Sequence, residues 1–316
     1  MAADRTPPIA ISISTLHRAD GLAQTLESLA RQRIAAARPG LVAIVVNNDP
    51  ADSAPRRVAA EIAERTGLAI EVLDEPQRGI APPRNRGLAA AIAFAGDHGL
   101  VGFIDDDEEA PEGWLEELLR VKAAHGAEIV TGPVEPIFET PPAAWIEHGK
   151  FFARTRLPTG TARRWAFTNN ILFDATLPKR LDRWFDDSFL RLGEDRHFFQ
   201  RLARSGARIV WADDAPVLER IPPRRANEKW LVERLRTVGR CVPIIERDLE
   251  GPIRAGVVCA AKGAVWIPIG LATRAAGVLG GKAMRVRGRM WTAYGVGLIE
   301  GVCSPSRAGR PAVADC

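Results

Sequence analysis

The sequence predicts an α/β protein built on a doubly wound sheet and followed by a helical C-terminal segment. Two observations carry this prediction. Short apolar runs alternate with amphipathic helical patterns along the N-terminal third, with short loops between them. The apolar run at residues 101–104 then ends abruptly in three aspartates, as a buried strand does where it leaves a sheet. Such alternation is typical of parallel strands that are covered by helices on both faces.

The composition is that of a globular protein. Of 316 residues, 46% are hydrophobic and 26% are charged, which excludes a disordered chain and a membrane protein with many spans. The net charge of +4 is mild, and no Lys/Arg run is interleaved with aromatic residues, so we expect no nucleic-acid partner. The first residues lack the apolar core of a secretory signal, and we expect a cytoplasmic protein.

The cysteines indicate neither a metal site nor a disulfide framework. Cys241, Cys259, Cys303 and Cys316 are widely spaced and match no zinc pattern. We therefore expect free thiols that are mostly buried.

Three strands and two helices are predicted before residue 75. The strands cover residues 9–14, 41–46 and 70–73, and the helices cover residues 21–33 and 54–66. In a parallel sheet the turns that follow the strands open at one carboxyl edge. We therefore expect a cluster of polar side chains in space, made of Thr15, Arg18, Asn48, Asp49, Asp105 and Asp107.

The segment at residues 75–91 is glycine-containing and basic before it becomes alanine-rich. Gly79 permits close backbone approach, and Arg84 opens the predicted helix. Arginine at a helix start opposes the helix dipole unless an anion lies there, and phosphate is the natural candidate. The alternative is a solvated basic turn.

The three aspartates predict a cation site. Strand alternation places Asp105 and Asp107 on one side and Asp106 on the other, so two carboxylates converge. Like charges at that distance favour a cation between them, and hard oxygen ligands suit Mg²⁺ or Mn²⁺. The alternative is an acidic turn that only caps the helix beginning at residues 111–114.

The following elements include a second acidic cluster. We expect a helix at residues 114–125, a strand at 128–132, an irregular binding loop or lid at 133–158, and a strand at 165–173 that contains Asn169 and Asn170. Glu194 and Asp195 begin a helix that Gly206 ends, and residues 207–212 form the last strand. The two acids are also explained by a purely structural first turn, because the helix dipole favours them.

The C-terminal part has a different character. Residues 230–247 predict a basic amphipathic helix, and the apolar stretch at 257–279 is interrupted by Lys262, Pro268 and Arg274. A basic cluster at 282–289 precedes a further apolar stretch at 290–302. These patterns are typical of helices lying in a membrane interface, and helices packing on the preceding domain are the alternative. We predict domains at residues 1–228 and 229–303, with a frayed tail at 304–316.

Five motifs in order resemble the family 2 glycosyltransferases with their GT-A fold, over residues 8–239: SISTLHR, VVNNDP, GIAPPRNRGLAAA, FIDDDE and GEDRHFFQRL. The resemblance implies a role for each matching residue. Thr15, Arg18, Asn48, Asp49, Arg84, Asp105 and Asp106 would hold the donor nucleotide, Asp105 and Asp107 the metal, and Asp195, next to Glu194, would be the general base. The family often has Asp where this chain has Asn47 and Asn48, although an amide carbonyl also accepts a uracil N–H. Pro83 stands where Ala is usual.

The expected function is an inverting transfer, assisted by Mg²⁺ or Mn²⁺, from a nucleotide-diphosphate sugar such as UDP-hexose to a hydroxyl of a glycan or lipid-linked glycan. The candidates for acceptor or phosphate contact are Trp145, Asn169, Asn170 and Arg225. We expect the protein to be attached peripherally to the cytoplasmic face of the inner membrane. The alternatives are a nucleotidyltransferase, for which the first turn lacks the expected Gly- and Lys-rich loop, and a non-catalytic membrane-docked subunit of a glycan assembly complex.

Overall fold

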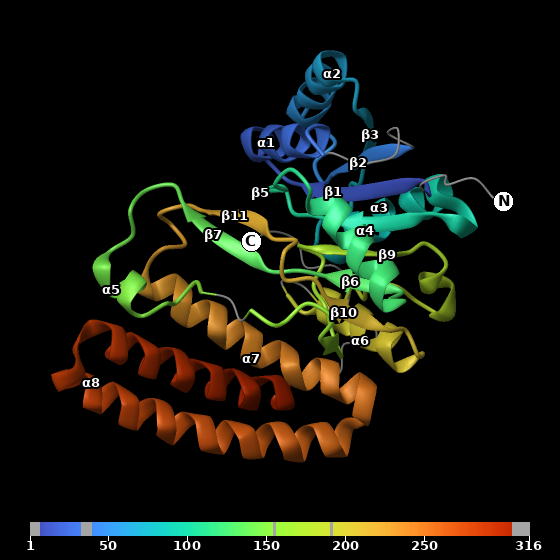
Figure 1. Ribbon diagram of the computed structural model, residues 1–316. Helices are drawn as coiled ribbons and strands as arrows, with labels where there is room; N and C mark the ends of the chain where they lie inside the picture. Colours follow the sequence, from blue (N-terminus) through green and yellow to red (C-terminus); the bar gives the residue numbers. More distant parts are fainter. Residues whose placement is uncertain (1–6, 33–39, 154–155, 190–191, 305–316) are drawn as a thin grey trace. The chain divides into compact units, whose positions relative to one another are not determined.

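The computed structural model describes residues 7–32, 40–153, 156–189 and 192–304, which divide into two compact units (Figure 1). The first unit contains the described residues up to 139, 153–186 and 194–221. The second contains residues 140–152, 187–193 and those from 222 onward. The division falls near the predicted domain boundary, at residue 222 and not 228, and the second unit also takes two internal segments.

The first unit holds every strand of the described residues. Its elements are β1 (Ile9–Thr15), α1 (Ala19–Ala30), β2 (Leu41–Asn47), α2 (Ala54–Thr66), β3 (Ala69–Asp74), α3 (Ala81–Ala95), the 3₁₀ helix η1 (Gly96–His98), β4 (Leu100–Phe103), β5 (Glu108–Glu109), α4 (Trp114–His125), β6 (Ile129–Thr131), β7 (Val134–Phe138), β8 (Ala162–Arg163), β9 (Ile171–Asp174), the 3₁₀ helix η2 (Leu177–Arg180), α6 (Glu194–Arg204), β10 (Ile209–Trp211) and β11 (Val217–Ile221).

The central sheet is mixed, in the order β3-β2-β1-β4-β9-β6-β10-β8. Strands β1 to β4 are parallel, β9 runs antiparallel to both β4 and β6, and β8 is antiparallel to β10. The predicted α/β class with a doubly wound sheet is confirmed, and the sheet also contains the antiparallel strands β9 and β8. Because the strand order reverses around β1, the carboxyl ends of β1 and β4 form the crevice where such sheets bind ligands.

Helices cover both faces of the central sheet. On one face, Leu22 and Leu26 of α1, Ile62 of α2 and Leu118 of α4 pack with the alternate side chains of β1. On the other face, α3 and α6 pack against β2 and β4, and Phe198 of α6 is fully buried there. The strand period and the helix period therefore agree on which side chains enter each core layer.

Three predicted elements differ from the structure. The expected irregular loop at residues 133–158 contains β7 and the short helix α5 (Ala144–His148). The strand expected at 165–173 begins only at Ile171, and β10 is not the last strand, because β11 follows it. Strands β5, β11 and β7 form a separate small sheet.

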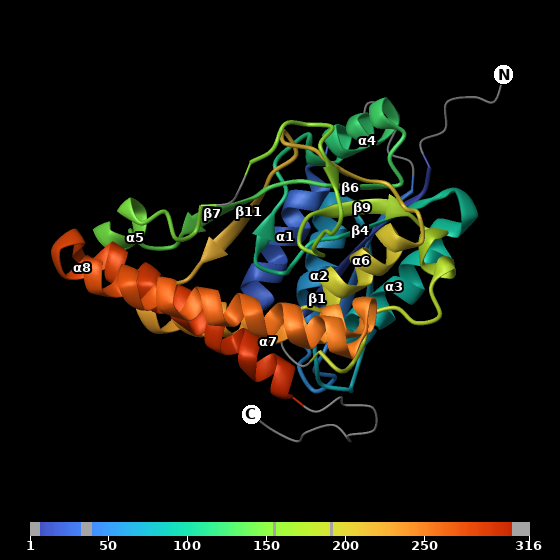
Figure 2. The same ribbon diagram turned by 90° about the horizontal axis from the view of Figure 1, so that it is seen from below.

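The second unit is helical. It contains α5, α7 (Glu228–Glu250) and α8 (Pro252–Cys303), and α7 and the two arms of α8 lie side by side (Figures 1 and 2). The arms meet at Gly281, whose φ of 85° is non-helical. The first arm runs unbroken through Pro268, so the interruption expected from Lys262, Pro268 and Arg274 does not occur. Glu300 joins the helices by pairing with Arg236 and Arg240, whose hydrogen bonds lower the pKa of Glu300 to about 2.

Of the cysteines that the structure describes, Cys259 is buried, Cys241 is half-buried and Cys303 is exposed, so the expectation that they are mostly buried is not met. Cys316 and residues 305–316 of the predicted tail lie outside the described residues.

Glycines allow the helices of the second unit to approach closely. A Cβ on Gly239 would lie 2.3 Å from the carbonyl oxygen of Tyr294, and one on Gly297 would lie 2.2 Å from that of Arg236. Both neighbours are backbone atoms, which cannot move without shifting a helix.

We therefore expect Gly239→Ala to destabilise the protein by about 1–3 kcal/mol through overpacking. Gly256→Ala is the matched control, because a Cβ there would meet only a side-chain atom at 3.9 Å. Thermal unfolding of the two variants measures the difference, and equal melting temperatures would contradict this account of the α7–α8 contact.

Candidate active site

The turn that follows β4 brings the aspartates to the end of β1. Asp106 is buried and accepts hydrogen bonds from Thr15 Oγ1, at 2.8 Å, and from Arg18 Nη1, at 2.9 Å. The same Arg18 nitrogen lies 3.0 Å from Asp107 Oδ2. Thr15, Arg18 and Asp107 therefore belong to one connected group, as predicted, but Asp106, which was expected on the other side, also belongs to it.

The expected alternation of the three aspartates is wrong. β4 ends at Phe103, and Asp106 and Asp107 lie in a turn, so the period of a strand no longer applies to them. Asp106 and Asp107 share Arg18, while Asp105 faces Arg84, with 3.4 Å between Arg84 Nη2 and Asp105 Oδ1. The conformation of the turn, and not the alternation of side chains along a strand, therefore decides which side chains these carboxylates face.

A fourth acid, Glu108, stabilises the backbone of this turn. It is buried, and its Oε2 accepts a hydrogen bond of 2.8 Å from the Asp105 amide. Burial raises the pKa of Glu108 well above its ordinary value. Thr25 of α1 donates to the Glu108 carbonyl at 2.7 Å, and a Cβ on Gly21 would lie 2.4 Å from the Asp106 carbonyl. The sequence shows Glu108 as the last acid of the DDDE run, but its supporting role was not predicted.

Arg84 joins two acidic clusters. It is buried in the first turn of α3 and forms a close ion pair with the buried Glu194 at the start of α6 and a longer one with Asp105. The helix begins three residues earlier than expected, at Ala81, because Pro82 and Pro83 fit a first turn whose amides need no intrahelical partner. Thus the anions that compensate Arg84 in the structure are two carboxylates of the chain itself.

The pKa of Asp105 is also strongly perturbed. Although 43% of its side chain is exposed, desolvation by the surrounding protein raises the pKa of Asp105 to about 6. Arg84 opposes this shift, and the charges of Asp107, Asp106 and Asp195 add to it. These carboxylates therefore lie close enough to interact, and a cation is favoured among them.

Asp195 lies at the start of α6, where the helix dipole favours a negative charge. Its side chain is 8% exposed, and Oδ1 accepts a hydrogen bond of 2.6 Å from the Arg196 amide. Phe198, Phe199 and Leu202 anchor α6 in the core, as predicted. The packing of α6 therefore fixes Asp195 near the aspartate turn.

The turn after β2 is held by its own side chains. Asn48 is buried and donates to the carbonyls of Glu75 and Gln77, both at 2.8 Å, which leaves its carbonyl oxygen as the group for a ligand. Asp49 pairs with Arg78 at 2.8 Å and with His17 at 3.2 Å. A hydrogen bond from the Ala51 amide, together with Arg78, lowers the pKa of Asp49.

Residues 10–181, more than half of the chain, match the family model described as glycosyl transferase family 2. The chain belongs to this family. The resemblance seen in the motifs is confirmed, and the protein is a glycosyltransferase. Family membership decides against the nucleotidyltransferase and the non-catalytic subunit.

Solved structures of S. aureus TarS share the fold. The structure of TarS 1-349 has a TM-score of 0.55 at 16% identity, covering 79% of this chain and 68% of that chain. The complex of TarS 1-349 with UDP-GlcNAc has a TM-score of 0.55 at 15% identity, covering 93% and 90%. The complex with UDP has a TM-score of 0.54 at 15% identity, covering 97% and 94%. At this identity the likeness shows the GT-A fold alone. No curated protein matches the chain.

The residues expected to contact the acceptor of this glycosyltransferase have different surroundings. Asn170 is fully buried, donates to the carbonyls of Pro133 and Ala215 and accepts from Trp114 Nε1, so it supports loops and does not meet a ligand. Asn169 beside it is half-buried. Trp145 and Arg225 belong to the second unit, where the Trp145 ring contacts Lys282.

The donor set suits a metal that keeps water and substrate oxygens in its shell. Among the described residues no three His, Cys, Asp or Glu side chains form a ready-made metal site. Mg²⁺ is usually held by one or two carboxylates together with substrate phosphates, and Asp105 and Asp107 offer two. The partial exposure of Asp105 and its unfavourable charge environment fit this mode of binding.

We expect Glu194→Gln to destabilise the fold by about 3–5 kcal/mol, because it leaves the buried Arg84 without its close counter-ion. Urea unfolding monitors the loss. Glu64→Gln, at an exposed position of α2, is the control and should change stability little. Equal stability of both variants would show that the Arg84–Glu194 pair does not hold α6 to α3.

Proposed function

We propose that the enzyme transfers a hexose from a nucleotide-diphosphate sugar to a hydroxyl of a glycan or lipid-linked glycan, with inversion at the anomeric carbon. The observation that carries the proposal is the separation of roles between two acidic groups. The Asp105–Asp107 turn offers carboxylates to a metal, and Asp195 stands apart on α6, near enough for its charge to raise the pKa of Asp105. Metal-assisted departure and proton removal need two such groups.

The proposed donor is UDP-hexose. TarS, which shares the fold, has been solved with UDP and with UDP-GlcNAc. In this chain the free carbonyl oxygen of Asn48 would accept the N–H of the base. Thr15, Arg18 and Asp106 would line the nucleotide site as a pre-formed hydrogen-bonded group. Asp49, which follows Asn48 in the turn after β2, would lie beside the bound nucleotide.

Asp105 and Asp107 would hold Mg²⁺ or Mn²⁺, which supplies positive charge to the departing diphosphate. Arg84 is buried between Asp105 and Glu194, so we assign it to positioning these acids and not to direct diphosphate contact. Arg18, with 38% of its side chain exposed, is the cation of this group that reaches the solvent side.

Asp195 is the proposed general base. It would accept the proton of the acceptor hydroxyl while the hydroxyl oxygen bonds to the anomeric carbon and the nucleotide diphosphate departs. We assign Glu194, which is buried and paired with Arg84, to holding Arg84 and not to proton removal. A single base with direct displacement inverts the anomeric configuration.

A lipid-linked acceptor requires contact with a membrane, and α8 is suited to provide it. α8 is long and apolar enough to cross a membrane by length and composition, criteria that core helices of soluble proteins also meet. Its first arm exposes a series of large apolar side chains, namely Ile253, Val257, Val258, Val265, Ile269, Leu271, Val278 and Leu279. Leu279 is 97% exposed and Ile253 is 82% exposed, which is costly in water.

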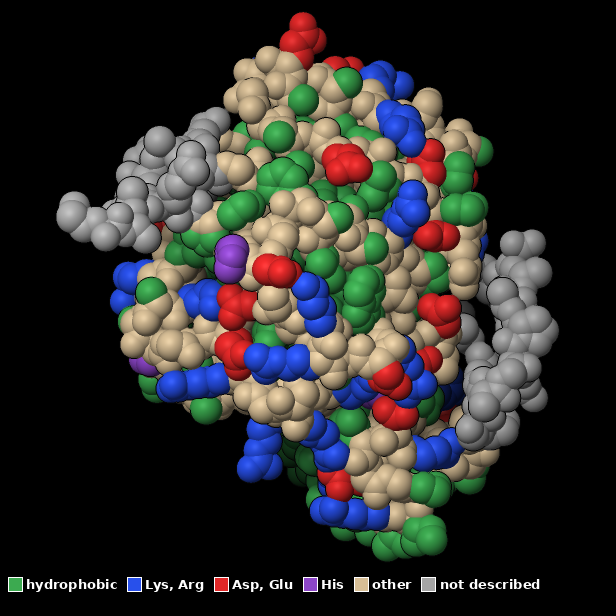
Figure 3. Space-filling view, turned by 90° about the vertical axis from the view of Figure 1, so that its right-hand side faces the viewer, with side chains coloured by type: hydrophobic (Ala, Val, Ile, Leu, Met, Phe, Trp, Pro, Cys, Tyr) green, Lys and Arg blue, Asp and Glu red, His purple; other side chains and the backbone are tan. Residues whose placement is uncertain are grey.

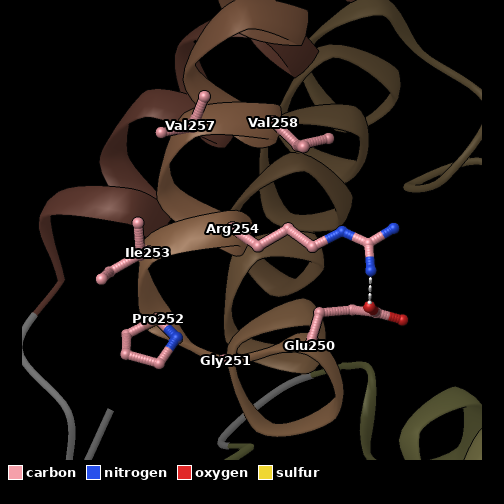
Figure 4. A pocket seen from close by; sticks show the side chains of 7 residues that line it. All are labelled: Glu250, Gly251, Pro252, Ile253, Arg254, Val257 and Val258. Carbon is pink, nitrogen blue, oxygen red and sulfur yellow. Dashed lines mark hydrogen bonds and ion pairs between the residues drawn. The ribbon is translucent and has the colours of Figure 1, made fainter.

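The surface views agree with this description. Figure 3 shows hydrophobic and basic side chains lying next to one another on the surface. Figure 4 shows a hollow at the α7–α8 junction that is lined by Ile253, Val257 and Val258, with one ion pair between Arg254 and Glu250. The two charged lining residues, Arg254 and Glu250, pair with each other, and the apolar remainder of the lining would suit an acyl chain better than a nucleotide sugar. We propose peripheral attachment, with the basic cluster of Lys282, Arg285 and Arg289 drawn to anionic head groups.

The metal assignment predicts that Asp107→Asn loses the thermal stabilisation that UDP gives in the presence of Mn²⁺, because one anionic ligand is removed. Asp97→Asn, at an exposed position of η1, is the control and should keep it. Unchanged Mn²⁺-dependent stabilisation in Asp107→Asn would exclude Asp107 as a ligand.

The base assignment predicts that Asp195→Asn lowers the transfer rate by about 10²- to 10⁴-fold, the usual contribution of a positioned base. Binding of UDP, measured by titration calorimetry, should remain. Transfer at the rate of the unchanged protein would move the role to another group.

Membrane attachment predicts co-sedimentation with liposomes that contain phosphatidylglycerol, and release by high salt. Leu271→Glu combined with Val278→Glu should abolish sedimentation, because it places charges on the exposed apolar arm. Ala60→Glu, on the exposed side of α2, should not. Absence of sedimentation at low salt would favour a soluble acceptor, and release by detergent alone would contradict peripheral attachment.

A further inference from the structure

Two arginines and two tryptophans of the first unit form a cluster that the proposed chemistry does not use. The Arg163 guanidinium carbon lies 4.9 Å from the centre of the Trp165 ring and 5.7 Å from that of Trp211. The Arg196 guanidinium carbon lies 5.2 Å from the same Trp165 ring. We call these four residues the arginine–tryptophan cluster. Cations and indole faces attract each other, so the cluster holds its two positive charges close together.

Arg163 has no anionic partner among the described residues. Its Nε is buried and without a hydrogen bond, and none of the ion pairs involves it. Burial lowers the pKa of Arg163, but an arginine side chain stays protonated in a protein. By contrast, Arg156 pairs with Asp213 at 2.8 Å, and Arg180 and Arg220 of the same unit pair with Glu128 and Glu109. A half-buried positive charge without a counter-ion is an unusual feature that a bound anion would explain.

The cluster adjoins the proposed base. Arg196 follows Asp195 on α6 and donates its amide to Asp195 Oδ1 at 2.6 Å. The chain after Trp165 enters β9, whose first residue, Ile171, pairs with Phe103 at the end of β4. Trp211 ends β10 at the same carboxyl edge, because β10 is parallel to β6 and Trp211 is in register with Thr131, which pairs with Ile171. Arg163 is in register with Ile209 at the other end of β10, and its guanidinium reaches back toward the Trp211 ring. An anion held by Arg196 therefore lies beside the turn of α6 that carries Asp195.

We propose that the arginine–tryptophan cluster binds an anionic group, a phosphate or a carboxylate, of the acceptor. This inference rests on the proposed transfer reaction and deepens it by assigning an acidic acceptor. The forked guanidinium matches the two oxygens of either anion, and the indole faces keep the forks in place. The negative charges of Asp105, Asp107 and Asp195 repel such a group, so the two arginines also keep it away from the metal-binding turn.

The test measures anion binding by the full-length protein in EDTA, which prevents binding through a divalent cation. Inorganic phosphate and glucuronate are titrated separately, and the fluorescence of the tryptophans reports binding. The expected result is saturable binding of at least one of the two anions, weakened at least tenfold in Arg163→Gln. Arg164→Gln, which removes the neighbouring exposed arginine, is the matched control and should bind as the unchanged protein does.

Arg163→Lys keeps the charge but loses the fork, and serves where Arg163→Gln does not fold. It should bind more weakly than the unchanged protein, and circular dichroism with thermal unfolding verifies the fold of each variant. Absence of anion binding by the unchanged protein, or equal affinities in Arg163→Lys, Arg163→Gln and Arg164→Gln, overturns the inference. If the unchanged protein binds an anion through Arg163 but neither binds UDP with Mn²⁺ nor hydrolyses UDP-GlcNAc, the proposed transfer fails while the anion site stands.

Discussion

The burial of several carboxylates at one sheet edge is the constraint on which the rest of the catalytic unit depends. Asp106, Glu108, Glu194 and Asp195 are each less than 9% exposed, and Asp105 and Asp107 adjoin them. Removing a charge from water is expensive unless it is paired or hydrogen-bonded. Two arginines, Arg18 and Arg84, compensate part of this charge, and in the proposed function a divalent cation bound with the donor compensates more of it.

Several segments that are distant in the sequence pack together at this edge of the central sheet. Gly21 lets α1 approach the Asp106 carbonyl, and Gly87 lets α3 approach Ser12 of β1, where a Cβ would lie 2.1 Å from the serine oxygen. The close approach of α3 places Arg84 between Asp105 and Glu194, and that pair in turn fixes the start of α6. The position of the proposed base is thus a consequence of how the buried charges are neutralised.

Much of this arrangement follows from the sequence. The alternation of apolar runs and amphipathic helices predicts the order β1 to β4 with their helices, and helix α4 matches its predicted bounds. The polar turns after β1 and β4 meet as expected, because parallel strands open at one edge. Asp195 is recognisable from its place after Gly193 at a helix start.

Other features depend on tertiary contacts that local patterns do not encode. The aspartates lie in a turn because Glu108 and Thr25 hold its backbone, so the strand period fails there. Asn170 resembles a ligand-binding side chain in the sequence, yet it fills its hydrogen bonds with Pro133, Ala215 and Trp114. Arg84 resembles a phosphate ligand until Glu194, far along the chain, is placed beside it. Each case involves a partner from a remote segment, namely Thr25, Trp114 or Glu194.

The central claim is that the uncompensated charge of the aspartate turn is met by a divalent cation that carries the donor diphosphate. The most direct measurement is anomalous diffraction from crystals grown with UDP and Mn²⁺. The account predicts a manganese peak within about 2.0–2.6 Å of a carboxylate oxygen of Asp105 or Asp107 and of the diphosphate, the range of hard-cation coordination. UDP bound with no manganese at these carboxylates would contradict it.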